Sequence, residues 1–222
     1  MQPRPRLVLL GKQGAGKGTQ AVRISEHYDI AHFSTGDLFR ELARLQTGFG
    51  LKAKQFMDAG ELVPDETVIG VVKEALAPGG PLGEGFVLDG FPRTRPQAEQ
   101  FEQILDGRPL DVVISLEVPL EIVLDRISGR RVCVDCQRVY HVNLPPTAHW
   151  ICDTCGGEVV QRDDDTEEAV ERRLQAYEQD TVPILDFYRG IGKRVKVVDG
   201  VGPGDAVFGR IVTEIDAAFT RS

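Results

Sequence analysis

A cluster of glycines near the N-terminus constrains the fold of this chain more than any other feature. Residues 11–20 read GKQGAGKGTQ and follow the apolar run Leu7–Leu10. Glycines between a strand and a helix let successive backbone N–H groups curl around phosphate oxygens, and the start of the helix adds its positive dipole end. We therefore expect a strand, a phosphate-binding loop and a helix from Gly16. The strand before and the helix after disfavour the alternative of a flexible turn that holds a lysine by chance.

The loop departs from the general pattern G-x-x-x-x-G-K-[ST] at one position. Gly18 stands where that pattern has a magnesium-binding hydroxyl, and the hydroxyl comes one place later, at Thr19. Lys17 still reaches the terminal phosphates as a point charge. Magnesium keeps several waters readily, so carboxylates behind those waters can hold it. The candidates are Asp89, which leaves a buried strand, and Asp37. A turn-forming aspartate before a glycine is an equal alternative for Asp89.

Strands and helices alternate along most of the chain, which favours an α/β fold with a parallel sheet and helices on both faces. The expected strands are 7–10, 32–34, 86–88, 112–116 and 195–198. The expected helices are 16–28, 37–44, 49–59, 65–77, 95–106, 119–128, 165–189 and 205–220. In the helix from 165, Asp165 resembles an N-cap with Glu168 at N3, and Pro183 is expected to bend or break it.

Two segments interrupt the alternation and are interpreted as inserts on one core. We call residues 34–67 the helical insert and residues 130–164 the cysteine insert, in which short alternating runs suggest hairpins. The remaining residues, 1–33, 68–129 and 165–222, would form the core.

Composition limits the class of protein. The chain has 222 residues, 41% hydrophobic and 27% charged, which suits one sizeable core. The net charge of −8 disfavours a nucleic-acid-binding protein. No apolar run approaches the roughly 20 residues of a membrane helix, and MQPRPRLVLLG leads into glycines instead of a cleavage site. We expect a cytoplasmic protein without membrane contact. We also expect a monomer, because no hydrophobic patch in the sequence indicates an interface.

All four cysteines lie in the cysteine insert. Cys133, Cys136, Cys152 and Cys155 form the pattern C-x2-C-x15-C-x2-C. This spacing is typical of a zinc site, in which four thiolates surround one ion and leave no position for substrate. Two disulfides or four free thiols are the alternatives, and a cytosolic location disfavours the disulfides. We expect a structural Zn²⁺ that stabilises an insert too small for its own core.

Several motifs, in order and at fixed spacing, resemble the adenylate kinases of the bacterial form with a long lid. They are GAGKGTQ at 14–20, STGDLFR at 34–40, DAGELVPD at 58–65, LDGFPRT at 88–94, GRRVC at 129–133 and RDDDTEEAVERRL at 162–174. The resemblance runs from about residue 6 to the final helix. Gly18 is the family's own residue, whereas Gln13 stands where the family usually has proline. The resemblance implies a P-loop kinase core, with the helical insert binding the nucleoside monophosphate and the cysteine insert serving as a zinc lid.

The resemblance also implies a function. It is the reversible, Mg²⁺-dependent transfer of the terminal phosphoryl group of ATP to AMP, which gives two ADP and balances adenine nucleotides. On the ATP side it implies Gly14, Ala15, Gly16, Lys17, Gly18, Thr19, Arg126, Arg130, Val139, Tyr140 and Gly202. On the AMP side it implies Thr35, Arg40, Glu61, Leu62, Val63, Gly90, Arg93, Gln97, Arg162 and Arg173.

These assignments suit the chemistry of phosphoryl transfer, which spreads charge over the equatorial oxygens of the transferred group. Five cations would surround that charge as catalytic residues: Lys17, Arg93, Arg130, Arg162 and Arg173. No general base is needed because the attacking AMP phosphate oxygen is already anionic. The amide of Gln97 can read adenine because it both donates and accepts.

Three other interpretations remain. A sister kinase would take UMP, CMP or GMP, although the long cysteine insert and Gln97 favour AMP. A zinc-ribbon ATPase that binds nucleic acid would need a basic insert, but between Cys133 and Cys155 there is one arginine and no lysine. A nucleotide-binding protein without catalysis is disfavoured because all five candidate cations are present.

Overall fold

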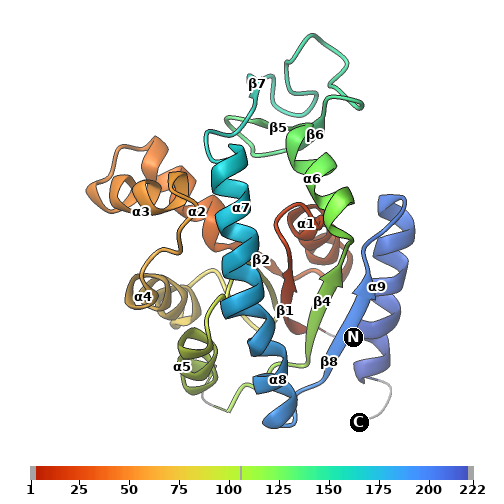
Figure 1. Cartoon of the computed structure of the whole chain (residues 1–222). Coiled ribbons are helices and arrows are strands. Elements are labelled where there is room, and N and C mark those ends of the chain that lie inside the picture. The colour runs from red at the N-terminus through yellow and green to blue at the C-terminus, as the bar shows by residue number, and fades with distance from the viewer. Residues whose placement is uncertain (1–3, 106, 220–222) are drawn as a thin grey trace.

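The computed structural model describes residues 4–105 and 107–219, and a five-stranded sheet lies at its centre, in the order β2-β3-β1-β4-β8 (Figure 1). The strands are β1 (Arg6–Gly11), β2 (Ala31–Ser34), β3 (Phe86–Asp89), β4 (Val112–Glu117) and β8 (Val195–Asp199). All neighbouring strands in this sheet are parallel. The predicted parallel α/β fold is therefore confirmed.

The register of the sheet brings the phosphate loop close to the candidate magnesium carboxylate. Asp89 at the end of β3 is paired with Leu9 of β1 on one side and with Ser34 of β2 on the other. The carboxyl ends of parallel strands share one edge, where ligands bind in folds of this kind. The glycine loop, the start of the helical insert and Asp89 therefore meet there.

Helices cover both faces of the sheet. Alternate residues of β1 point to opposite faces, so that Val8 and Leu10 belong to one apolar cluster and Leu7 and Leu9 to the other. The first cluster includes residues of α4 (Asp65–Leu76), α5 (Arg95–Leu105) and α8 (Val182–Gly190). The second includes residues of α1 (Lys17–Tyr28), α6 (Leu120–Ser128), α7 (Glu167–Ala176) and α9 (Gly204–Phe219).

The helical insert contains α2 (Thr35–Arg44) and α3 (Gly48–Asp58), which stand to one side of the core in Figure 1. The Ser34 side chain accepts a hydrogen bond from the Asp37 N–H and begins α2 as its N-cap. α2 and α3 touch at Gly50, where a Cβ would lie 2.2 Å from the Leu42 carbonyl carbon. Only glycine permits this close helix contact.

The cysteine insert contains a second, antiparallel sheet in the order β6-β5-β7, at the top of Figure 1. Its strands are β5 (Arg130–Cys133), β6 (Val139–His141) and β7 (Val159–Val160). The small hairpins expected there are confirmed. Their apolar cluster is small and contains only Cys133, Tyr140, Cys152 and Val159, with Trp150 packed against it, among the described residues.

The predicted N-cap of the helix from 165 is wrong by one residue. The cap is Thr166, whose hydroxyl accepts from the Ala169 N–H, and α7 begins at Glu167. The Asp165 side chain points instead to Arg130 and Gln13. A short acidic run offers several cap-type residues, and the tertiary partners of Asp165 decided which of them caps the helix.

Pro183 does not end the helix that contains it. α7 continues into α8 through a π-helical turn, Tyr177–Thr181, in which the Val182 N–H bonds the Tyr177 carbonyl five residues back. The wider turn lets the chain reach Pro183 in helical form although proline donates no hydrogen bond. The remaining elements lie within two residues of the predicted bounds. The predicted helix ends at 106 and 220 lie outside the described residues.

Candidate active site

The loop between β1 and α1 needs its glycines. Gly14 and Gly16 have φ of 79° and 98°, in the left-handed region that side chains disfavour. A Cβ on Gly14 would lie 2.8 Å from Ile127 and 2.9 Å from the Val123 carbonyl oxygen of α6. Ala15 is buried and Thr19 is exposed. Backbone curvature and packing against α6 together fix the loop as the sequence predicts.

Lys17 lies at the start of α1 and folds back over the loop. Its Nζ donates to the carbonyl oxygens of Gly11 at 2.7 Å and Lys12 at 2.9 Å. Burial lowers the pKa of Lys17 to about 8; Asp89 opposes this shift, while Arg93 and Arg130 add to it. The lysine thus lies among other cations and close to one carboxylate.

Asp89 is the carboxylate beside Gly18. A Cβ placed on Gly18 would lie 3.4 Å from Asp89 Oδ2, and Asp89 is 9% exposed. A carboxylate therefore stands next to the position where the general phosphate-loop pattern has a hydroxyl. Asp37, the other candidate, pairs with Arg40 and lies 3.8 Å from Arg162 Nη2. Burial would raise the pKa of Asp37, but these two arginines hold it below its usual range.

The loop after β3 collects three of the residues expected on the AMP side. Thr35 Oγ1 donates to the Gly90 carbonyl oxygen at 3.0 Å, and Arg93 Nε donates to the same oxygen at 2.8 Å. A Cβ on Gly90, whose φ is 77°, would lie 2.9 Å from Arg93 Nη2. Burial, and after it repulsion from nearby Arg173, lowers the pKa of Arg93 to about 10.

Arg162 and Arg173, which flank the run of aspartates at 163–165, join this group around Asp164. Arg173 Nη2 donates to Asp164 Oδ2 at 2.6 Å and to the Met57 carbonyl oxygen of α3 at 2.6 Å. Burial, and after it repulsion from Arg40 and Arg130, lowers the pKa of Arg162 to about 10. Arg162 therefore lies close enough to Arg40 of α2 and to Arg130 for their charges to repel.

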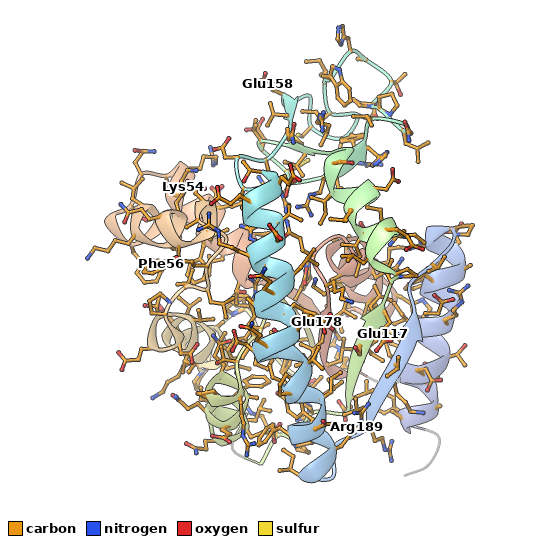
Figure 2. The ribbon with its side chains drawn as sticks, viewed as in Figure 1. Lys54, Phe56, Glu117, Glu158, Glu178 and Arg189 are labelled. Atoms are coloured by element: carbon orange, nitrogen blue, oxygen red, sulfur yellow. The ribbon has the colours of Figure 1, made fainter. Side chains whose placement is uncertain are left out.

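The helical insert also meets the end of the cysteine insert on the surface. Lys54 of α3, labelled in Figure 2, lies 3.2 Å from Asp163 and 2.8 Å from Asp58. Arg40 Nη1 lies 3.9 Å from Asp164 Oδ2. The Lys54–Asp163 and Arg40–Asp164 contacts join segments more than a hundred residues apart.

Arg130 and Arg126 approach the phosphate loop from the side of α6. Arg130 Nε donates to Asp165 Oδ2 at 2.8 Å, and Gln13 Nε2 of the loop donates to Asp165 Oδ1 at 3.1 Å. Arg126 Nη1 donates to the Ala15 carbonyl oxygen and its Nη2 to that of Gly200, both at 3.1 Å.

The sequence did not indicate that Asp164 and Asp165 hold site arginines. The run of aspartates at 163–165 was a usable signal, because an acidic run between site arginines can neutralise them. Gln13 was noted only as a departure from the family, and the structure gives it a partner in Asp165.

The remaining predicted residues differ in exposure. Gln97 and Val63 are buried, Leu62 is half-buried and Glu61 is exposed. In the cysteine insert, Val139 is exposed, whereas Tyr140 turns its hydroxyl to Cys152 Sγ at 3.4 Å. The Tyr140 side chain, which is 9% exposed, therefore faces the cysteine cluster. Gly202 follows β8 with φ of 109°.

The four cysteines come together, as their spacing predicts. Their Sγ atoms all lie within 4.8 Å of one another. The sulfurs of Cys133 and Cys155 are 3.4 Å apart and those of Cys136 and Cys152 are 3.5 Å apart. A disulfide needs about 2.05 Å, whereas Zn–S bonds of about 2.3 Å place tetrahedral sulfurs about 3.8 Å apart. A hydrogen bond from the Tyr140 hydroxyl lowers the pKa of Cys152 to about 6, whereas burial raises the pKa values of Cys133 and Cys136 in the absence of an ion. The cluster fits a four-thiolate metal site.

Comparison with known proteins identifies one family. A family model described as adenylate kinase matches residues 9–193. A protein of Carboxydothermus hydrogenoformans named adenylate kinase is 49% identical over 210 residues, 93% of this chain and 97% of that relative. Another of Acidothermus cellulolyticus, also named adenylate kinase, is 48% identical over 215 residues, 95% of this chain and 97% of that relative. Among the described residues, no helix is long and apolar enough to cross a membrane.

Proposed function

Since the chain belongs to the adenylate kinase family, whose members transfer a phosphoryl group between ATP and AMP, we propose a specific role for each part of its site. As a nucleoside-monophosphate kinase of this family, the protein transfers the terminal phosphoryl group of ATP to AMP and forms two ADP. The proposal concerns which residues bind each nucleotide, which cations act in the transfer and what the two inserts do.

ATP binds at the glycine loop and along the side of the cysteine insert. The N–H groups of the loop surround the phosphates, and Lys17 leaves the carbonyls of Gly11 and Lys12 to follow the transferred group. Arg126 supports this loop through its bond to Ala15. Val139, the backbone of Tyr140, and Gly202 lie on the adenine side.

AMP binds beside it, between the helical insert and the loop after β3. Thr35, Arg40, Glu61, Leu62, Val63, Gly90, Arg93, Gln97, Arg162 and Arg173 form this side. Because Gln97 is only 1% exposed, the surrounding side chains have to move apart before a base can reach its amide. Arg93 lies between the two phosphate positions and contacts the acceptor phosphate.

The observation that carries this proposal is the crowding of cations at one place. Lys17, Arg93 and Arg162 all have lowered pKa values, and each shift includes repulsion from other site cations after the effect of burial. Such repulsion costs free energy until a polyanion arrives. A pair of nucleotides with phosphates in line offers that charge, and the same cations then neutralise the transition state.

Mg²⁺ suits the carboxylate beside the loop. Asp89 Oδ2 would accept from water on an ion held by the ATP phosphates, and the absence of a side chain at Gly18 leaves room beside it. Bound beside this carboxylate, Mg²⁺ would neutralise phosphate charge during the transfer. Asp37 is a weaker candidate because its carboxylate already forms ion pairs with Arg40 and Arg162.

The inserts have different roles in this proposal. The helical insert, 34–67, binds AMP, and the cysteine insert, 130–164, closes over ATP with Zn²⁺ in its four-thiolate site. Closure excludes water, which would otherwise hydrolyse ATP, and brings Arg130 and Arg162 to the phosphates. The core is 1–33, 68–129 and 165–222. The protein acts as a cytoplasmic monomer without nucleic acid or membrane partners.

An acceptor panel tests the proposal. Purified protein, Mg²⁺ and ATP are mixed with AMP, CMP, UMP or GMP, and ADP formation is followed for the native chain and for Gln97→Leu. We expect rapid turnover with AMP alone, reversible from ADP, and a large rise in the KM for AMP in the variant. Equal turnover with several acceptors, or an unchanged KM in Gln97→Leu, would contradict the role given to Gln97.

A further inference from the structure

A closed set of hydrogen bonds surrounds the Gln97 amide. Gln97 Oε1 accepts from the Arg93 backbone N–H at 2.7 Å, and Gln97 Nε2 donates to Asp65 Oδ1 at 2.7 Å. The other oxygen of Asp65 accepts from the Thr94 hydroxyl at 2.9 Å. That hydroxyl in turn accepts from the Gln97 backbone N–H at 3.3 Å. Asp65, at the start of α4, thus holds the side chain of Gln97 in the first turn of α5.

These partners fix which way the amide faces. A backbone N–H can only donate, so the oxygen of Gln97 has to face Arg93. A carboxylate can only accept, so the Gln97 NH₂ has to face Asp65. If the amide were rotated by half a turn, donor would face donor and acceptor would face acceptor in a buried site. Leaving such groups unpaired is costly, and Gln97 therefore keeps one orientation.

Beyond these hydrogen bonds, the Gln97 amide can still offer one donor, at Nε2, beside one acceptor, at Oε1. Each of its two groups has one hydrogen bond within the protein, and no further partner is recorded for them in the described part of the chain. One N–H of Nε2 and one lone pair of Oε1 therefore remain for a base that reaches the amide once the surrounding side chains have moved apart. Adenine presents the matching pair, an amino donor at position 6 next to a ring-nitrogen acceptor. Hypoxanthine has a carbonyl acceptor at position 6, which would face the Gln97 oxygen.

We propose that Asp65 is a specificity-determining positioning residue, which holds the Gln97 amide in the orientation that accepts AMP and rejects 6-oxopurine monophosphates. The inference rests on the proposed function, because it takes Gln97 as the residue that reads the acceptor base. A glutamine that could rotate freely would present its NH₂ to a carbonyl at position 6. Asp65 prevents that rotation, so the chain distinguishes AMP from IMP through a side chain that does not touch the base.

The decisive variant is Asp65→Asn. Asparagine has nearly the same shape, but its amide can either accept from Gln97 or donate to it, so one of the two constraints on rotation is lost. We expect the ratio of kcat/KM for AMP to that for IMP to fall by about tenfold, mostly through faster reaction with IMP. IMP is the suitable probe because it changes position 6 without adding the 2-amino group of GMP.

Glu66→Gln is the matched control. Glu66 is exposed in the same first turn of α4. The variant Glu66→Gln therefore removes the same charge as Asp65→Asn but no hydrogen bond to Gln97. Its AMP-to-IMP ratio should equal that of the native chain. A structural defect in Asp65→Asn would lower the reactions with AMP and IMP by one common factor. An unchanged ratio in a folded Asp65→Asn protein overturns the inference.

Two further variants keep the test decisive. If Asp65→Asn does not fold, Thr94→Val frees one oxygen of Asp65, and the ratio should fall in the same direction by a smaller factor; an unchanged ratio then overturns the inference. Gln97→Leu separates the two proposals. If it leaves the AMP-to-IMP ratio unchanged, the proposed role of Gln97 fails. If it lowers the ratio while Asp65→Asn does not, only the role of Asp65 fails.

Discussion

The helical insert and the cysteine insert interrupt the same core but are held together in different ways. Phe39, Ala53 and Val63 of the helical insert belong to the apolar cluster that also contains Val8 and Leu88 of the sheet. The cysteine insert has a separate and very small cluster, in which two of the buried residues are cysteines. The first insert extends an existing core, whereas the second has little apolar surface of its own, and its four cysteines fit a metal site that would stabilise it. The four predictions below test this difference and the core between the two inserts.

The largest expected effect comes from removing the metal. Chelation of Zn²⁺, or Cys152→Ser, should unfold the cysteine insert locally, because structural zinc contributes roughly 10 kcal/mol to small domains of this kind. Hydrogen exchange at residues 130–164 should accelerate by more than about a thousandfold. Residues 34–67 should keep their protection, and added Zn²⁺ should restore the chelated native chain. Equal loss of protection in both inserts would show that they are not independent.

Phe39→Ala should destabilise the helical insert and leave the cysteine insert unaffected, the opposite of metal removal. Phe39 is 3% exposed and packs against Phe49, so its removal should lower the free energy of unfolding by about 3–5 kcal/mol. The measurement is urea denaturation with and without chelator, and the loss should be the same in both. Phe49→Ala is the matched control, since Phe49 is 43% exposed and should cost much less. A loss in Phe39→Ala that disappears after chelation would contradict the comparison.

The boundary between the cysteine insert and the core should depend on Asp165 more than on the helix cap beside it. Asp165→Ala leaves Arg130 without its buried partner and should cost about 3 kcal/mol. Thr166→Ala removes only the N-cap of α7 and should cost about 1 kcal/mol. Thermal or urea unfolding of both variants checks the order. If Thr166→Ala costs more, the stability of this boundary comes from the helix and not from the ion pair.

The smallest expected effect concerns the phosphate loop between β1 and α1, which belongs to the core and to neither insert. Burial holds the pKa of Lys17 at about 8 in the free protein, and bound phosphate should raise it. At pH 8 the free lysine is about half protonated and the complex fully so, which predicts uptake of about half a proton per ATP. The uptake should vanish near pH 6, where the lysine is already charged.

Calorimetry in buffers of different ionisation enthalpy measures this uptake. Lys12→Met, which leaves Lys17 in place, should retain it, and Lys17→Met at saturating ATP should lose it. If Phe39→Ala retains the proton uptake, the titration of Lys17 on ATP binding does not depend on the helical insert. Its presence in Lys17→Met would assign the proton to another group.

The sequence by itself determined the features that depend on local order. The glycines between Leu10 and Gln20 require a strand, a loop and a helix, because few other residues allow that backbone. The C-x2-C pairs require two knuckles, and the alternation of apolar runs requires a parallel sheet. Each of these patterns depends on the type and spacing of residues along the chain, so the sequence reveals it even though the strands themselves pair over long range.

The tertiary structure alone decided the partners of charged and polar groups. Asp165 was predicted to cap a helix, but it binds Arg130, 35 residues away, and Gln13, 152 residues away. Gln97 was predicted to read adenine, but nothing in the sequence indicated that Asp65, 32 residues before it, fixes the direction of its amide. An ion pair or a hydrogen bond carries no periodicity along the chain. Its partner follows only when the sheet and helices have brought distant segments together.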